Sequence, residues 1–305
     1  MVAETSPVAA PRSVAEAALQ AASLVSAMPR LVLEARRAAS SVAHGLHGRR
    51  RAGAGENFWQ YRRFLGGEPA QRVDWRRSAR DDHLYVRERE WEAAHTVWIW
   101  PDLSASMDYA TGARAPKRER ALVVAFALAE LLVRGGERAG VPGLMPPSAS
   151  RRIVERLAES VVLAGALPQG LPPAFVPAPT AEVVLLGDFW SPAGEVAERI
   201  STLASGGARG HVVQIVDPAE ETFPFSGRIE FSDPEGGERL TVGRAEGWRQ
   251  DYALKLDAHR AALRAAAERH GWSFIIHRTD RPASELLLAL HMRMGAGGPV
   301  AGGRA

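Results

Sequence analysis

The chain has 305 residues, 46% of them hydrophobic, which is enough for one large domain or two modest domains with a proper core. It contains no cysteine, and this excludes a disulfide framework, a thiolate nucleophile and a zinc–thiolate site. The formal net charge is only +3, and neither Lys117 nor Lys255 follows a glycine, so the chain has no Walker loop and is not itself a P-loop ATPase.

Residues 1–48 predict a helical N-terminal extension. Ser13-Val-Ala-Glu16 is typical of a capping box at the start of a helix, and we expect Pro29 to interrupt that helix. A second helix is expected from about Leu31 to His44. The first residues lack a basic start followed by an apolar centre, so no secretory signal is expected and the cytoplasm is the predicted location.

Residues 49–94 combine arginines with aromatic residues. Such a segment can bind nucleic acid by base stacking and phosphate contacts. Acidic residues run through the same segment, however, and they favour internal ion pairs in a structured piece that packs on the core. We therefore expect buried aromatic rings and arginine–carboxylate pairs; the side chains concerned are Tyr61, Trp75, Arg72, Arg76, Arg80, Asp74 and Glu90.

The apolar run that begins at Val97 stops at Asp102, and hydroxyls follow at Ser104 and Ser106. These side chains can point to one side of a turn and present only hard oxygen ligands, which suits Mg²⁺ or Mn²⁺. Asp and Ser are also common at turns that hold no ion, because their side chains bond to nearby backbone. The apolar helical stretch 121–133 completes a strand–helix unit and is too short to span a bilayer.

A second apolar strand is predicted at Glu182-Val-Val-Leu-Leu-Gly, and it ends in Asp188. Ligands of open parallel sheets collect at the carboxyl ends of the strands. We therefore expect Asp102 and Asp188 to converge, although they are far apart in the sequence.

The C-terminal half continues the alternation of strands and helices. Strands are expected at 211–216 and 272–277, helices at 248–270 and 282–294, and a hairpin insertion near 227–242. Asp217 follows the first of these strands and is interpreted as turn chemistry rather than as a ligand. The glycine-rich tail, 295–305, is expected to be disordered.

The motif Asp102-Leu-Ser-Ala-Ser resembles the opening of the metal-ion-dependent adhesion site of von Willebrand factor type A domains. In such a site a threonine from a second loop usually joins, and the resemblance implies that Ser148 or Ser150 takes its place here. Asp188 stands at the expected acidic position of the third loop.

A longer string of residues resembles the domain of unknown function 58 family, over about residues 48–290. The string comprises Gly55-Glu-Asn-Phe, Tyr61-Arg, Gly67-Glu-Pro, Arg72-Val-Asp-Trp75, Ala79-Arg80, Val86-Arg and Glu90, and it leads into the Asp102 motif. Members of that family are usually found beside MoxR-type AAA+ ATPases. The resemblance implies a von Willebrand type A-like domain that acts with an ATPase in the assembly or maturation of other proteins.

The predicted fold is a three-layer α/β domain over residues 95–294, von Willebrand type A-like or Rossmann-like, with a mostly parallel sheet. The predicted function is a non-enzymatic interaction module. A Glu or Asp from a client protein or from the ATPase would complete the coordination of the bound Mg²⁺ or Mn²⁺. A metal-dependent hydrolase or phosphotransfer enzyme is the alternative, against which stands the absence of a recognisable general base or nucleophile. A nucleic-acid binder is a third possibility, carried by residues 49–80.

Overall fold

The apolar runs form the strands of a central sheet. In the computed structural model the described residues are 14–46, 58–64, 71, 73–80, 83–89, 95–112, 114–164, 170–234 and 239–296. The sheet has six strands in the spatial order β10-β7-β6-β3-β4-β5. Their bounds are β3 (Thr96–Pro101), β4 (Arg138–Val141), β5 (Met145–Ser148), β6 (Glu182–Gly187), β7 (Arg209–Val216) and β10 (Ser273–Arg278).

The sheet is mostly parallel. The pairs β10–β7, β7–β6, β6–β3 and β3–β4 are parallel, and only β5 runs antiparallel, beside β4. Val183 and Leu185 face one side and Val184 and Leu186 the other, and all are at most 1% exposed, as expected for strands covered on both faces. The parallel strands therefore end at one edge of the sheet, which we call the carboxyl edge.

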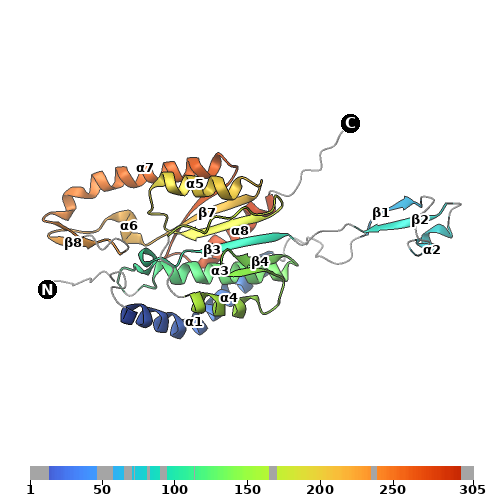
Figure 1. Ribbon diagram of the computed structural model, residues 1–305, viewed down its shortest axis with the longest axis horizontal. Coiled ribbons are helices and arrows are strands. Elements are labelled where there is room, and N and C mark those ends of the chain that lie inside the picture. Colours follow the sequence, from blue (N-terminus) through green and yellow to red (C-terminus); the bar gives the residue numbers. More distant parts are fainter. Residues whose placement is uncertain are drawn as a thin grey trace.

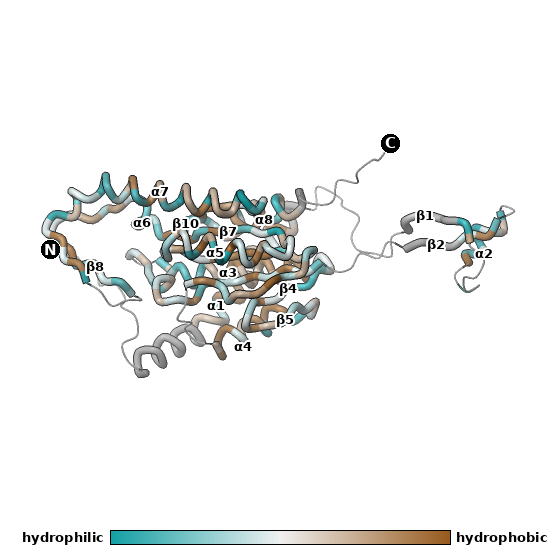
Figure 2. Tube along the Cα trace, turned by 45° about the horizontal axis from the view of Figure 1, so that its top comes forward, coloured by the Kyte–Doolittle hydropathy of each residue, from teal (hydrophilic) through white to brown (hydrophobic). Residues whose placement is uncertain are grey.

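Helices cover both faces of the sheet (Figure 1). On one face lie α1 (Val14–Leu46), α3 (Lys117–Arg134), α4 (Ile153–Ala164) and α8 (Ala283–Ala296), and on the other α5 (Ala193–Ala204) and α7 (Arg249–Glu268). In Figure 2 α7 alternates between hydrophilic and hydrophobic colours, as expected of a helix with one face on the sheet. The predicted three-layer α/β fold is confirmed.

Helix α1 corrects one expectation. It is continuous from Val14 to Leu46, and Pro29 lies inside it rather than between two helices. Met28, Leu31 and Ala35 recur at helical spacing and are at most 8% exposed in the same core cluster as the sheet. Burial of this apolar stripe therefore outweighs the hydrogen bond that a proline removes from a helix, which costs about 3 kcal/mol.

Between β7 and β10 the chain forms smaller elements. Helix α6 (Pro218–Thr222) follows β7, and β8 (Ile229–Ser232) and β9 (Arg239–Val242) form an antiparallel hairpin where the insertion is expected. The short 3₁₀ helices η2 (Ala105–Asp108) and η3 (Ala245–Trp248) complete the domain. No described helix is long and apolar enough to cross a membrane.

A small separate piece precedes the sheet domain. Strands β1 (Phe58–Arg63) and β2 (Tyr85–Arg89) pair antiparallel, and the single turn α2 (Trp75–Ser78) lies between them in sequence. The Asp74 carboxylate caps α2 by accepting from Arg77 N at 3.0 Å, and Ser78 Oγ accepts from Tyr85 N at 2.9 Å. The second of these hydrogen bonds joins α2 to β2.

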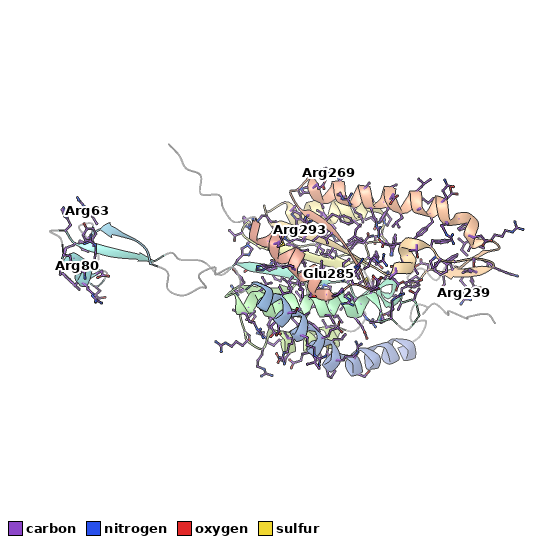
Figure 3. The ribbon with its side chains drawn as sticks, turned by 180° about the vertical axis from the view of Figure 1, so that it is seen from behind. Arg63, Arg80, Arg239, Arg269, Glu285 and Arg293 are labelled. Carbon is purple, nitrogen blue, oxygen red and sulfur yellow. The ribbon has the colours of Figure 1, made fainter. Side chains whose placement is uncertain are left out.

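The described part of residues 49–94 differs from expectation. It stands apart from the sheet domain (Figure 1), so the expected packing on the core is not found there. The Trp75 side chain is 61% exposed rather than buried, because a single helical turn has no second layer to cover it. Arg76 and Arg80 are also exposed, and Figure 3 shows Arg63 and Arg80 on this piece. The side chain of Tyr61, and both Arg72 and Glu90, lie outside the described residues.

Candidate functional site

The Asp102 turn directly follows strand β3 at the carboxyl edge. Asp102 N donates to Leu186 O at 2.8 Å, and its carboxylate Oδ1 accepts from Ser104 N at 2.8 Å. The hydroxyls of Ser104 and Ser106 lie 3.1 Å apart. Leu103, between the polar residues, is 1% exposed and anchors the turn in the core. The turn therefore presents a carboxylate and hydroxyls from one short segment.

Gly187, at the end of β6, makes room for this turn. A Cβ atom at Gly187 would lie 3.1 Å from both Cβ and Oδ2 of Asp102, and 3.4 Å from the Trp100 ring. Only a residue without a side chain lets the Asp102 carboxylate, which is fully buried, pack this closely against the neighbouring strand.

Asp188 lies at the same edge, one residue beyond Gly187, as the parallel-strand argument predicts. The carboxylate is engaged, however, because its Oδ2 accepts from Lys117 Nζ at 2.8 Å. Lys117 is the first residue of α3 and is fully buried. The structure therefore brings Asp102 and Asp188 to one edge and gives Asp188 a cation from within the chain.

The loop after β6 is held in an unusual backbone conformation. Phe189 has φ 53°, in the left-handed region that bulky residues rarely adopt, and its ring is buried. Its carbonyl accepts from His259 Nε2 at 2.8 Å, and the Asp188 carbonyl accepts from Gln214 Nε2 at 3.0 Å. Contacts from α7 and β7 thus fix the backbone that carries Asp188.

Glu220, in α6, is a second partner of Lys117. Lys117 Nζ donates to Glu220 Oε1 at 2.5 Å, and Trp190 Nε1 donates to the same oxygen at 3.1 Å. The other oxygen, Oε2, accepts from Asp217 N at 2.7 Å and completes a capping box at the start of α6. Asp217 itself accepts from Ala219 N at 2.9 Å and from Thr111, so it is used in turn chemistry, as the sequence indicates.

The electrostatics of this cluster follow from its burial. Burial disfavours the charged Lys117 ammonium, but the adjacent Asp188 and Glu220 carboxylates outweigh this and raise the pKa of Lys117 above its ordinary value. Burial raises the pKa of the Glu220 carboxyl, although Lys117 opposes that shift. The pKa of the Tyr109 hydroxyl, whose ring lies 5.8 Å from Lys117 Nζ, is raised to about 12, chiefly by burial. The two carboxylates that Lys117 contacts therefore stabilise its ammonium inside the cluster.

Ser148 and Ser150 do not reach the carboxyl edge, which corrects their expected role. Ser148 is in β5, opposite Ala139, and Ala139 pairs with Val97 near the start of β3. At about 3.3 Å per residue, that position lies roughly 16 Å along the strand from Asp102. Ser148 Oγ accepts instead from Arg156 Nη1 at 2.8 Å and from Ser150 N at 3.2 Å.

The residues of the turn can be compared with the needs of a divalent ion. Asp102, Ser104 and Ser106 fit a hard cation, because one turn supplies a carboxylate together with two hydroxyls that lie 3.1 Å from each other. Asp188 fits less well, since Lys117 already contacts one of its oxygens. In the described residues no group of three or more His, Cys, Asp or Glu side chains is arranged to hold a metal ion, but the predicted site has only two carboxylates.

Sequence reasoning missed the Lys117–Glu220 contact and a buried polar chain at the opposite end of the sheet. In that chain His211 Nε2 lies 2.8 Å from Glu182 Oε1, and His211 Nδ1 lies 2.7 Å from Ser273 Oγ. It links β6, β7 and β10 at their amino ends. For Lys117 one signal was available, because it is one of two lysines in an arginine-rich chain and begins a helix.

A mostly parallel sheet covered by helices on both faces, with an Asp-x-Ser-x-Ser turn after one strand and an aspartate after its neighbour, defines a three-layer α/β protein. The model of the family described as Protein of unknown function DUF58 matches residues 60–262. The chain belongs to that family.

Three mycobacterial relatives are described as uncharacterized proteins. Proteins of Mycobacterium bovis and of two Mycobacterium tuberculosis strains are each 25% identical over 280 residues, covering 85% of this chain and 86% of the relative. Two solved structures align with 67% of this chain and all of their own. They are an aerotolerance-related membrane protein of Bacteroides fragilis (TM-score 0.42, 16% identity) and the conserved hypothetical protein BatB of Bacteroides thetaiotaomicron (TM-score 0.36, 13% identity).

Proposed function

We propose that this protein is a non-enzymatic interaction module that captures an acidic side chain of a partner at the carboxyl edge. Asp102, Ser104 and Ser106 would hold Mg²⁺ or Mn²⁺ there. The observation that carries the proposal is the buried turn after β3. In this turn the hydroxyls of Ser104 and Ser106 lie 3.1 Å apart, and backbone amides hold the turn and the Asp102 carboxylate in place. When bound, the ion would supply an open coordination position for a partner's Glu or Asp.

The partner that we propose is a MoxR-type AAA+ ATPase, acting with this chain in the cytoplasm on a client protein. The sequence has no Walker loop, so a P-loop ATPase that acts with this chain would be a second protein. Division of labour follows from this: the ATPase supplies the energy, and the carboxyl edge supplies recognition of an acidic group.

Capture from native lysate tests this proposal. The full chain would be used as bait with Mg²⁺ and with EDTA, and the purified chain alone should hydrolyse no ATP. We expect an AAA+ ATPase to be recovered with Mg²⁺ and lost with EDTA and with Ser104→Ala. Ser148→Ala is the matched control, since that serine lies at the other end of the sheet. Equal recovery of the ATPase in all conditions, or recovery of none, would refute the proposal.

Nucleic-acid binding is a second candidate, favoured by one observation. Trp75 is 61% exposed, and Arg76 and Arg80 beside it are exposed as well. A bare indole among arginines can stack on a base while the arginines contact phosphates. Titration of the chain with single-stranded oligonucleotide at rising salt would show steeply salt-dependent binding that Trp75→Ala removes. The absence of binding at low salt would eliminate this candidate.

A further inference from the structure

Lys117 occupies a place where a positive charge is unfavourable by local criteria. It is the first residue of α3, and the N-terminal end of a helix carries partial positive charge that disfavours a cation. It is also fully buried, which removes the ammonium from water. Its position is therefore explained by the carboxylates that it contacts, and not by the helix that carries it.

Those contacts occupy the acid that a metal site of the expected kind would use. Lys117 Nζ lies 2.8 Å from Asp188 Oδ2 and 2.5 Å from Glu220 Oε1. The remaining oxygen of Asp188 accepts from Trp190 N at 3.4 Å. A divalent ion that approached Asp188 on the Lys117 side would meet an ammonium that cannot leave for solvent, and the two like charges would repel each other.

The neighbouring basic group is already committed elsewhere. Arg118, the next residue of α3, forms an ion pair with Asp108, with 2.7 Å between Arg118 Nη2 and Asp108 Oδ1. Asp108 is also buried. Burial raises the pKa of Asp108, and Arg118 opposes the shift. Two adjacent residues at the start of α3 thus contact different acids: Arg118 contacts Asp108, and Lys117 contacts Asp188 and Glu220.

We propose that Lys117 is the resident cation of Asp188 and limits divalent ions to the Asp102 turn. This inference rests on the proposed function and adds to it which of the two carboxylates is available to the ion. Lys117 lowers the metal affinity of the carboxyl edge by keeping the second carboxylate from the ion. Removal of its charge should convert a weak site with one carboxylate into a tighter site with two.

Binding of Mn²⁺ to the purified full chain tests this directly, by calorimetry and by electron paramagnetic resonance. Lys117→Met keeps the length of the side chain and removes its charge, and we expect it to raise Mn²⁺ affinity by about tenfold or more. Lys117→Arg keeps the charge and should leave the affinity near that of the wild type. Lys117→Met combined with Asp188→Asn should lose the gain, because the freed carboxylate is then absent.

A further variant covers the possibility that Lys117→Met does not fold. Lys117→Met with Glu220→Gln removes one positive and one negative charge together, and Asp188 remains available. The same gain in Mn²⁺ affinity is expected, accompanied by a rise in melting temperature on addition of Mn²⁺ that exceeds the rise for the wild type.

An affinity equal to or below the wild-type value in these variants would overturn the proposal, as would no Mn²⁺ binding by any of them. These outcomes are separate from the lysate experiment. If Lys117→Met gains affinity while no ATPase is captured, the role of Lys117 stands and the proposed function fails.

Discussion

Gly187→Ala is expected to disturb the Asp102 turn with a single added methyl group. The new Cβ would lie 3.1 Å from Cβ and Oδ2 of Asp102 and 3.4 Å from the Trp100 ring, whereas carbon atoms pack comfortably at about 3.5–4.0 Å. Asp102 cannot withdraw easily, because its amide donates to Leu186 O and its carboxylate accepts from Ser104 N. Overpacking of a fixed core contact of this kind costs about 1–3 kcal/mol.

The assay is urea unfolding of the wild type and of two glycine variants. Gly194 is the matched control, since a Cβ there, near the start of α5, meets nothing within 4 Å. We expect Gly194→Ala to be neutral or to stabilise the protein by up to about 1 kcal/mol, because alanine favours helix. Gly187→Ala should lower the unfolding free energy by about 1–3 kcal/mol and weaken Mn²⁺ binding. If the two variants prove equally stable, the close contact between Gly187 and Asp102 is refuted.

Other substitutions test other parts of the molecule. Gly210→Ala would place a Cβ 2.5 Å from the buried Trp272 ring, so we expect the unfolding free energy in urea to fall by about 3 kcal/mol. A smaller fall than for Gly187→Ala would contradict the close packing of Gly210 on Trp272. Burial, reinforced by Arg120, lowers the pKa of His277 to about 4, so the folded state favours neutral imidazole. The unfolding free energy should therefore fall as the pH drops from about 6.5 to about 4, by at most roughly 3 kcal/mol. His277→Leu should flatten this pH dependence, and an unchanged profile in that variant would argue against a neutral, buried His277. Trp75→Ala should change the unfolding free energy by less than about 0.5 kcal/mol, because the ring is exposed, and a larger loss would show that it packs on the domain.

The carboxyl edge could be predicted because its signal is local. Strands β3 and β6 are each an apolar run that stops at an acid, and their parallel pairing brings Asp102 and Asp188 to one edge of the sheet. The contacts of Lys117 could not be predicted in this way. Its partners lie 71 and 103 residues away in the sequence, and a lone lysine at a helix start is normally exposed.

The other differences also have physical causes. Pro29 fits within α1 because the helix is held by tertiary burial, which local helix rules do not include. Met145-Pro-Pro-Ser148 resembles a loop in sequence, yet it forms the antiparallel strand β5 at the sheet border, where prolines are tolerated. This extra strand carries Ser148 away from the Asp102 turn.

Helix α1 has a consequence for how the protein can be divided. Its buried stripe belongs to the same core as the sheet, and α1 contacts α3, α4 and α8. The folded unit is therefore made from two stretches of chain, and the piece containing β1, β2 and α2 is inserted between them. A fragment that starts at residue 95 would lack Leu31 and Ala35. It would expose to water the apolar surfaces of the three helices that α1 covers, and a large exposed apolar patch favours aggregation. In chain order, the inserted piece follows α1 and precedes β3.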